Sequence, residues 1–235
     1  MKSPLAPLWQ RGVGGICSTA LVSARRYVNS IGVKGRPVDV SGAFHTADRW
    51  AFLLVNRTLQ NPAFDFLMPI LSDKRAGLLL VAVIVPILFA RCGRQVWPRI
   101  AIAVFAVALS DLGATLLKDL LQRTRPCHLI ADVHLLTGCT GSFAMPSGHA
   151  SNIFALAGAV WTARTRWRWA VAGLAVGVAY SRVYLGAHYP GDVIVGAVWG
   201  GAIGWALMRG AISLLPPRCF PRGCRTKSDS YSFLG

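Results

Sequence analysis

Long apolar stretches alternate with short polar connections through the last two thirds of the chain. A helix that crosses the hydrocarbon core of a membrane needs about 20 mainly apolar residues. Five stretches approach this length, at residues 76–90, 100–117, 147–163, 169–181 and 193–208. The first is short, but Arg75 and Arg91 bracket it and can extend to the lipid headgroups. The pattern therefore predicts an all-α, polytopic bundle of membrane helices.

Residues 51–71 are also apolar, but Asn56, Arg57, Asn61 and Asp65 interrupt them. By itself such a segment is typical of helices that lie in the membrane interface. Seven basic residues precede position 50, however, and they favour a cytoplasmic amino terminus. With five later crossings, that orientation requires the segment to cross as well. We therefore predict about six transmembrane helices, of which the first is irregular.

Composition agrees with a membrane protein, because 54% of the 235 residues are hydrophobic and the mean hydropathy is +0.47. The formal charge of +16 could indicate binding to nucleic acid. The basic residues instead collect after the first, third and fifth stretches, where lysine and arginine mark cytoplasmic loops. We therefore expect the lipid bilayer as a partner and no nucleic acid. The opposite ends of the helices should face away from the cytoplasm.

The same pattern divides the chain into three segments. We predict a poorly ordered tail at residues 1–45, a membrane-embedded domain at 46–210 and a basic tail at 211–235 that contacts anionic lipid. A cleaved signal sequence within residues 12–24 is the alternative for the first segment. Glycines recur every four residues in the last two apolar stretches, a spacing that lets membrane helices pack closely. They are Gly173 and Gly177, and Gly196, Gly200 and Gly204.

Cations gather where apolar stretches meet polar loops. Lys118 and Arg125 are seven residues apart, about two helical turns, so a continuing helix places both near one face. Alone, such a pair is more often two cations that extend to the membrane surface. Arg182 adds a third cation from another stretch. Because positioned positive charge stabilises a phosphoryl group during transfer, we interpret the three as a phosphate-binding set.

The motif Pro146-Ser147-Gly148-His149 opens the third stretch. Ser147 is suited to cap the helix, and free N–H groups at a helix start bind anions. Gly148 lets a phosphate approach the backbone closely. A simple serine cap would account for Ser147 but would leave His149 at a membrane boundary without a role.

His188 and Asp192 begin the fifth stretch, where Pro190 suits the first position of the helix. Asp192 then lies in the first turn and can reach back to His188. A carboxylate bonded to one imidazole nitrogen fixes the tautomer and leaves the other nitrogen as a nucleophile. The alternative is a helix cap beside an interfacial histidine.

The order and spacing of these clusters, K-x6-R-P, then P-S-G-H, then S-R-x5-H-x3-D, resemble the type-2 phosphatidic acid phosphatase superfamily of lipid phosphate phosphatases over residues 72–208. The resemblance implies a six-helix fold with the active site at the non-cytoplasmic interface. In it His188 attacks phosphorus, Asp192 orients His188, and His149 protonates the leaving oxygen. The residues that would hold the phosphate are Lys118, Arg125, Ser147, Gly148 and Arg182. Vanadate-dependent haloperoxidases resemble the same motifs, but they are soluble proteins.

The resemblance implies an integral phosphatase of the inner (cytoplasmic) membrane with its active site facing the periplasm or exterior. A polyprenyl pyrophosphate or a lipid A type glycolipid is the favoured substrate, ahead of phosphatidylglycerophosphate and phosphatidate. Transfer of the phosphoryl group to a lipid acceptor instead of water is the alternative activity. A membrane scaffold or transporter half with an inert anion site is the non-enzymatic alternative, and the two histidines argue against it. The oligomeric state is left open.

The sequence also bears on metals and disulfides. The chain contains no glutamate, and its aspartates do not cluster as ligands of a hard metal would. We therefore expect a metal-independent reaction without a cofactor. Cys127 and Cys139 share the loop between the second and third stretches. A bridge between them would stabilise this loop by about 3 kcal/mol in an oxidising compartment.

Three further polar residues lie outside these motifs. Asp111 lies inside the second stretch, too far from Lys118 along the helix to pair with it, so we expect a buried partner on another helix. His128 and His134 lie in the same loop as the two cysteines. Contact with a substrate headgroup is one interpretation, and solvated side chains are the commoner case.

Overall fold

The structure, a computed structural model, describes residues 42–165 and 167–214, and all the secondary structure in this range is helical. The predicted all-α fold is therefore confirmed for the described residues. The elements in chain order are α2 Gly42–Leu53, the π-helix η2 Leu54–Thr58, α3 Pro62–Ser72, α4 Lys74–Cys92, the 3-10 helix η3 Gly93–Val96, α5 Trp97–Leu121, α6 Pro126–Leu129, α7 Gly148–Thr162, α8 Arg168–Tyr184 and α9 Pro190–Leu214. The chain divides into two units, Met1–His45 and Thr46–Gly235, and the contacts described below lie within the second.

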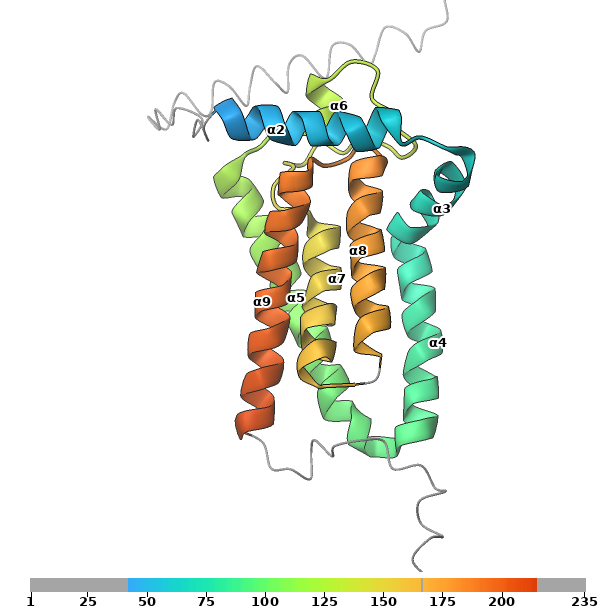
Figure 1. The fold of residues 1–235 in the computed structure, drawn as a ribbon. Helices are drawn as coiled ribbons and strands as arrows, with labels where there is room; N and C mark the ends of the chain where they lie inside the picture. The colour runs from blue at the N-terminus through green and yellow to red at the C-terminus, as the bar shows by residue number, and fades with distance from the viewer. Residues whose placement is uncertain (1–41, 166, 215–235) are drawn as a thin grey trace, which may run out of the picture. The chain divides into compact units, whose positions relative to one another are not determined.

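The helices α4, α5, α7, α8 and α9 lie alongside one another, and α2 lies across one end of them (Figure 1). Within the described residues, two helical segments have the length and apolar composition needed to cross a membrane: Trp97–Leu129 and Pro190–Leu214. Large apolar side chains are exposed on several of the helices, including Leu78, Val104, Leu116 and Val198. Such a surface suits lipid contact and would be unfavourable in water.

Local sequence sets where the helices begin and end. The Asn61 side chain accepts a hydrogen bond from the Phe64 N–H at 2.9 Å and caps α3, and the Asp73 carboxylate accepts one from the Arg75 N–H at 2.9 Å and caps α4. Pro190 is the first residue of α9, as the sequence predicts.

The crossing predicted for residues 51–71 stays a prediction, but the structure divides this segment among the end of α2, the π-helix η2 and the 11-residue α3. Asn56 donates hydrogen bonds to the carbonyl of Tyr184 at 2.7 Å and to that of His134 at 3.0 Å. The Tyr184 hydroxyl in turn donates to Asp65 at 2.6 Å. Because Tyr184 ends α8, these contacts keep η2 and the start of α3 at one end of the bundle (Figure 1). The polar residues that interrupt this segment bind that end, which removes the cost of exposing them to lipid.

Several sequence predictions fall outside the described residues. They are the cytoplasmic amino terminus, the cleavable segment at residues 12–24, and most of the two tails predicted at 1–45 and 211–235. The described parts of these tails, 42–45 and 211–214, are helical.

Helix α9 packs against α7 through glycines. A methyl group at Gly200 would overlap the backbone carbonyl of Ser151, and one at Gly204 would overlap that of Ala155. The glycine spacing therefore allows the close helix packing predicted for α9. The same prediction is wrong for Gly173 of α8, where a methyl group would meet no atom of another described helix within 4 Å.

Candidate active site

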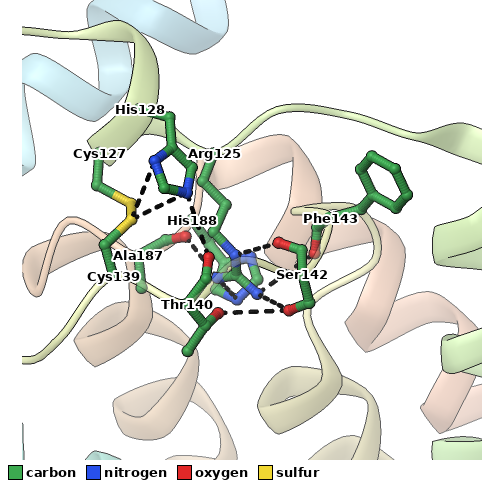
Figure 2. Close-up of a disulfide and its surroundings, with 9 residues drawn as sticks. All are labelled: Arg125, Cys127, His128, Cys139, Thr140, Ser142, Phe143, Ala187 and His188. Carbon is green, nitrogen blue, oxygen red and sulfur yellow. Dashed lines mark hydrogen bonds between the residues drawn. A yellow bond between two sulfur atoms is a disulfide. The ribbon is translucent and has the colours of Figure 1, made fainter. Parts of the chain in front are cut away.

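Arg125 lies between α5 and α6 and is nearly fully buried. Its Nε donates to the Ser142 carbonyl at 2.7 Å, and its Nη2 donates to the Ser142 hydroxyl at 3.0 Å and the Phe143 carbonyl at 3.3 Å. Its Nη1 donates to the Ala187 carbonyl at 2.9 Å (Figure 2). Arg125 thereby joins the loop before α7 to the connection between α8 and α9.

The same guanidinium reaches His188, which is also buried. Arg125 Nη1 lies 3.0 Å from His188 Nε2 (Figure 2). Because an arginine side chain can only donate hydrogen bonds, Nε2 must offer its lone pair. The proton of a neutral His188 then sits on Nδ1. This is the tautomer in which Nε2 can act as a nucleophile.

Asp192 is fully buried and lies on the Nδ1 side of the His188 ring. His188 Nδ1 and Asp192 Oδ2 are 3.6 Å apart, which is longer than a hydrogen bond. Oδ2 instead accepts a hydrogen bond from the Tyr189 N–H at 2.9 Å. Catalytic hydrogen bonds are often long without substrate and shorten when substrate binds. The distance between His188 Nδ1 and Asp192 Oδ2 therefore still allows Asp192 to orient the imidazole.

The start of α7 lies beside these residues, since the Ser147 N–H donates to the Asp192 carbonyl at 2.9 Å. Ser147 occupies the N-cap position, but its hydroxyl makes no capping hydrogen bond. That hydroxyl is fully buried and has no partner among the described residues. A Cβ at Gly148 would lie 3.7 Å from Lys118 Nζ. The glycine thus leaves open the space between a cation and a helix start, where an anion would be bound.

His149 and Arg182 complete the cluster. Electrostatic interactions reach His149 from Arg182, Lys118, His188 and Lys74, so this histidine lies among the predicted site residues. Arg182 Nη1 donates to the Ser72 hydroxyl, which ties α8 to the end of α3. Lys74, the first residue of α4, was not among the predicted site residues, because it belongs to none of the sequence motifs.

Asp111 binds a partner on another helix, as predicted. Asn152 Nδ2 donates to Asp111 Oδ1 at 2.7 Å, and so links α5 to α7. Asp111 is exposed and Asn152 is only half-buried, however, so the partner is not the buried residue that was predicted. Its charge still acts on Lys118, because both side chains approach Gly148.

The pKa of His188 is lowered to about 4, chiefly by burial; Asp192 acts to raise this pKa, and the charges of Arg125 and Arg182 act to lower it. The imidazole is therefore neutral at pH 7. A neutral imidazole is required for attack on phosphorus.

Two charged residues that the sequence analysis left out of the site also contact it. Arg123 and Asp48 form an ion pair, and Arg123 forms a second ion pair with Asp192. Arg123 lies two residues before Arg125, and this proximity was the available signal. Asp48 could not have been found from the sequence, because it comes from α2, far from every motif.

The loop that supplies partners for Arg125 is closed by a disulfide. Cys127 and Cys139 are bonded, with 6.3 Å between their Cα atoms (Figure 2). Within the described residues, these cysteines and His128 form the only group of three potential metal ligands, and both thiols are in the disulfide. The expectation of a solvated His134 is wrong, since its Nε2 lies 2.8 Å from Asp65 Oδ1.

Fold and site together define a class of protein. The helices have surfaces suited to lipid. At one end they carry cations from three segments and a helix start that is open to an anion. A buried neutral histidine lies there as well, next to a carboxylate. This arrangement is typical of a membrane enzyme that transfers phosphoryl groups.

Comparisons with known proteins identify the family. The PAP2 superfamily model matches residues 99–212. The chain is 33% identical over 170 residues to the lipid A 4′-phosphatase of Bacteroides thetaiotaomicron, covering 65% of this chain and 72% of that protein. It is 29% identical over 151 residues to the undecaprenyl-diphosphatase of Sulfolobus acidocaldarius, covering 63% of this chain and 71% of that protein.

A solved structure shares the fold. The transmembrane PAP2 type phosphatidylglycerolphosphate phosphatase from Bacillus subtilis matches with a TM-score of 0.61 and 22% identity, covering 76% of this chain and 90% of that one. The chain belongs to the PAP2 superfamily of membrane lipid phosphatases. The family resemblance seen in the sequence is thereby confirmed.

Proposed function

We propose that this protein hydrolyses a phosphate monoester or pyrophosphate of a membrane lipid through a phosphohistidine at His188. The observation that carries the proposal is the hydrogen bond from Arg125 to His188 Nε2. It leaves the lone pair on Nε2 and the proton on Nδ1, toward Asp192. A histidine that served only to bind phosphate would not need this tautomer.

In the proposed first step, Nε2 of His188 attacks phosphorus and forms a P–N bond. The bond from phosphorus to the lipid oxygen breaks, and that oxygen takes a proton from the protonated imidazole of His149, which becomes neutral. Asp192 stabilises the positive imidazole that results. In the second step, water gives a proton to the neutral His149 and attacks phosphorus, and the bond from phosphorus to Nε2 of His188 breaks. Inorganic phosphate leaves, and both histidines return to their starting states.

Positive charge would stabilise both transition states. A transferring phosphoryl group spreads charge over three equatorial oxygens. In the proposal these oxygens are bound by Lys118, Arg125 and Arg182, by the Ser147 hydroxyl and by the Gly148 N–H. The unpartnered Ser147 hydroxyl supports this assignment, because a buried polar group without a partner is costly unless a ligand satisfies it.

The favoured substrates are a lipid A type glycolipid and a polyprenyl pyrophosphate. The names of the two relatives support these choices, since one acts on lipid A and the other on undecaprenyl diphosphate. We propose further that the protein lies in the inner membrane, with the end of the helix bundle that carries the active site toward the periplasm or exterior. The arginines after α4, α7 and α9 support that orientation.

Phosphate release from a lipid panel tests the proposal. Purified full-length protein in detergent would be given lipid A, undecaprenyl diphosphate, phosphatidylglycerophosphate and phosphatidate. We expect inorganic phosphate from at least one of the first two, and none with His188→Ala. Phosphate appearing on a second lipid, without release of inorganic phosphate, would show transfer instead of hydrolysis. No release from any lipid would reject the proposed activity.

Metal dependence is tested in the same assay. The proposed mechanism assigns the phosphate charge to protein cations, so EDTA should leave the rate unchanged. Loss of activity in EDTA and its recovery with added magnesium would contradict this assignment.

A further inference from the structure

Arg123 makes two ion pairs, one of them with the proposed catalytic carboxylate. Its Nη1 donates to Asp192 Oδ1 at 2.7 Å, and its Nη2 donates to Asp48 Oδ2 at 2.5 Å. The guanidinium also lies over the ring of Tyr189, 4.5 Å from its centroid. The side chain of Arg123 is 12% exposed, that of Asp48 4% and that of Asp192 0%. The three charges therefore form a buried group next to His188.

Arg123 and Tyr189 together fix the rotation of the Asp192 carboxylate. Oδ1 accepts from Arg123, and Oδ2 accepts from the Tyr189 N–H while it faces His188 Nδ1. Without Arg123, Oδ1 would be buried without a charged donor. The carboxylate would then turn or take up a proton, since an unpaired buried charge is unfavourable. In either case it would no longer hold the Nδ1 proton of His188.

Asp48 holds Arg123 in place from α2. Its Oδ1 accepts a hydrogen bond from the Gly191 N–H at 2.7 Å, and its Oδ2 accepts from Arg123. The Gly191 N–H lies in the first turn of α9, where backbone donors have no helical acceptor. Asp48 thus fastens the same helix start that carries Asp192.

From this geometry we propose that Arg123 is a positioning residue, which acts on the reaction through Asp192, and that Asp48 positions Arg123. This inference rests on the proposed roles of His188 and Asp192. Arg123 directs two of its nitrogens to carboxylates and is not one of the proposed phosphate ligands. Its loss should therefore slow the chemical step without weakening substrate binding.

Kinetics of Arg123→Gln test the proposal, with p-nitrophenyl phosphate and lipid A as probes. We expect kcat to fall about 10- to 100-fold, the usual range for groups that orient a reacting residue, while KM stays the same. The good leaving group should not restore the rate, because the defect lies in the nucleophile. Arg123→Lys keeps the charge and should recover part of the rate. Asp48→Asn should lower kcat in the same way but less.

A double variant separates positioning from general stabilisation. If Arg123 acts through Asp192, then Arg123→Gln should cause no further loss in an Asp192→Asn background. Arg57→Gln is the matched control, because Arg57 also donates to a distant segment, the Ala131 carbonyl at 2.5 Å, but makes no contact with Asp192. It should leave kcat unchanged. Thermal melting in detergent shows whether each variant is folded. If Arg123→Gln does not fold, the kinetics of Arg123→Lys and Asp48→Asn test the proposal.

The outcomes distinguish this inference from the proposed function. Unchanged kcat in folded Arg123 variants, a raised KM as the main effect, or losses that multiply in the double variant would overturn the inference and leave the proposed function intact. Wild-type activity in Asp192→Asn would overturn the proposed roles, and the inference with them.

Discussion

The two site histidines differ in their surroundings, and this difference predicts different defects. His188 is buried between Arg125 and Asp192, whereas His149 lies at the start of α7 among cations. His188→Ala should remove nearly all turnover but retain substrate binding, because the cations remain. His149→Ala removes the proposed proton donor and should cost about 10²- to 10⁴-fold in kcat. Phosphate release and substrate binding by the purified variants measure both effects.

A change of leaving group checks this division of roles. p-Nitrophenolate needs little protonation, so the defect of His149→Ala should shrink with p-nitrophenyl phosphate. His188→Ala should gain nothing from the same substrate. Rescue of His188→Ala and not of His149→Ala would mean that the nucleophile and the acid are reversed.

The lowered pKa of His188 predicts activity at mildly acidic pH. A histidine of ordinary pKa, about 6.5, would be roughly 90% protonated at pH 5.5 and unable to attack. Because burial lowers the pKa of His188 to about 4, protonation of this group sets in only as the pH falls toward 4. The acidic limb of kcat/KM assigned to His188 should therefore lie near pH 4.

Substrate ionisation must be separated from this effect. Aryl phosphates with different phosphate pKa values shift any limb that belongs to the substrate and leave the limb of His188 in place. A limb near pH 6.5 that stays fixed across such a series would refute the lowered pKa.

At the scale of elements, the disulfide loop should support the position of Arg125. The Cys127–Cys139 bridge closes the loop just before Ser142 and Phe143, which accept hydrogen bonds from Arg125. Replacing both cysteines with serine should lower stability by up to about 3 kcal/mol and raise KM. Melting temperature and KM, each with and without reductant, measure these changes. Reductant should affect the wild type and leave the double variant unchanged; equal responses would argue against the bridge.

The packing of α7 on α9 should depend on glycine at the points of closest approach. Gly200→Ala would push a methyl group into the Ser151 carbonyl, and overpacking of this kind costs about 1–3 kcal/mol. Gly173→Ala is the control, since open space there lets the higher helix propensity of alanine stabilise α8 by up to about 1 kcal/mol. Melting in detergent should rank Gly200→Ala below wild type and Gly173→Ala at or above it. The opposite order would contradict the close packing.

At the scale of the whole molecule, the structure predicts that α2 and the disulfide loop lie on the same side of the membrane. Labelling of single cysteines introduced at exposed positions measures which side each position faces. The background for these variants has serine in place of Cys17, Cys92, Cys219 and Cys224. Ala47→Cys and Gly141→Cys should react with an impermeant maleimide from the non-cytoplasmic side. Arg94→Cys, in the turn between α4 and α5, should react only after lysis. If Ala47→Cys and Arg94→Cys were both labelled only after lysis, the two positions would lie on the same side of the membrane. That result would support the sixth crossing.

The charge pattern along the chain does not by itself account for where residues 51–71 lie. Seven basic residues before position 50 favoured a cytoplasmic amino terminus and so required an extra crossing. Asn56 and Asp65 instead bind groups at the end of α8, which satisfies them without a crossing. A count of charges measures the preference of a loop for one side of the membrane. It cannot register hydrogen bonds to residues more than a hundred positions away.

By itself, the sequence determined the helical class, the five apolar stretches and the motifs that place Lys118, Arg125 and His188 near helix ends, because helix boundaries and hydrophobic length are local properties. Only the tertiary structure decided which groups meet. It gave His188 its tautomer through Arg125, and it placed Asp48 and Arg123 against Asp192. The geometry of buried ion pairs depends on how separate helices pack, and no spacing along one chain segment encodes it.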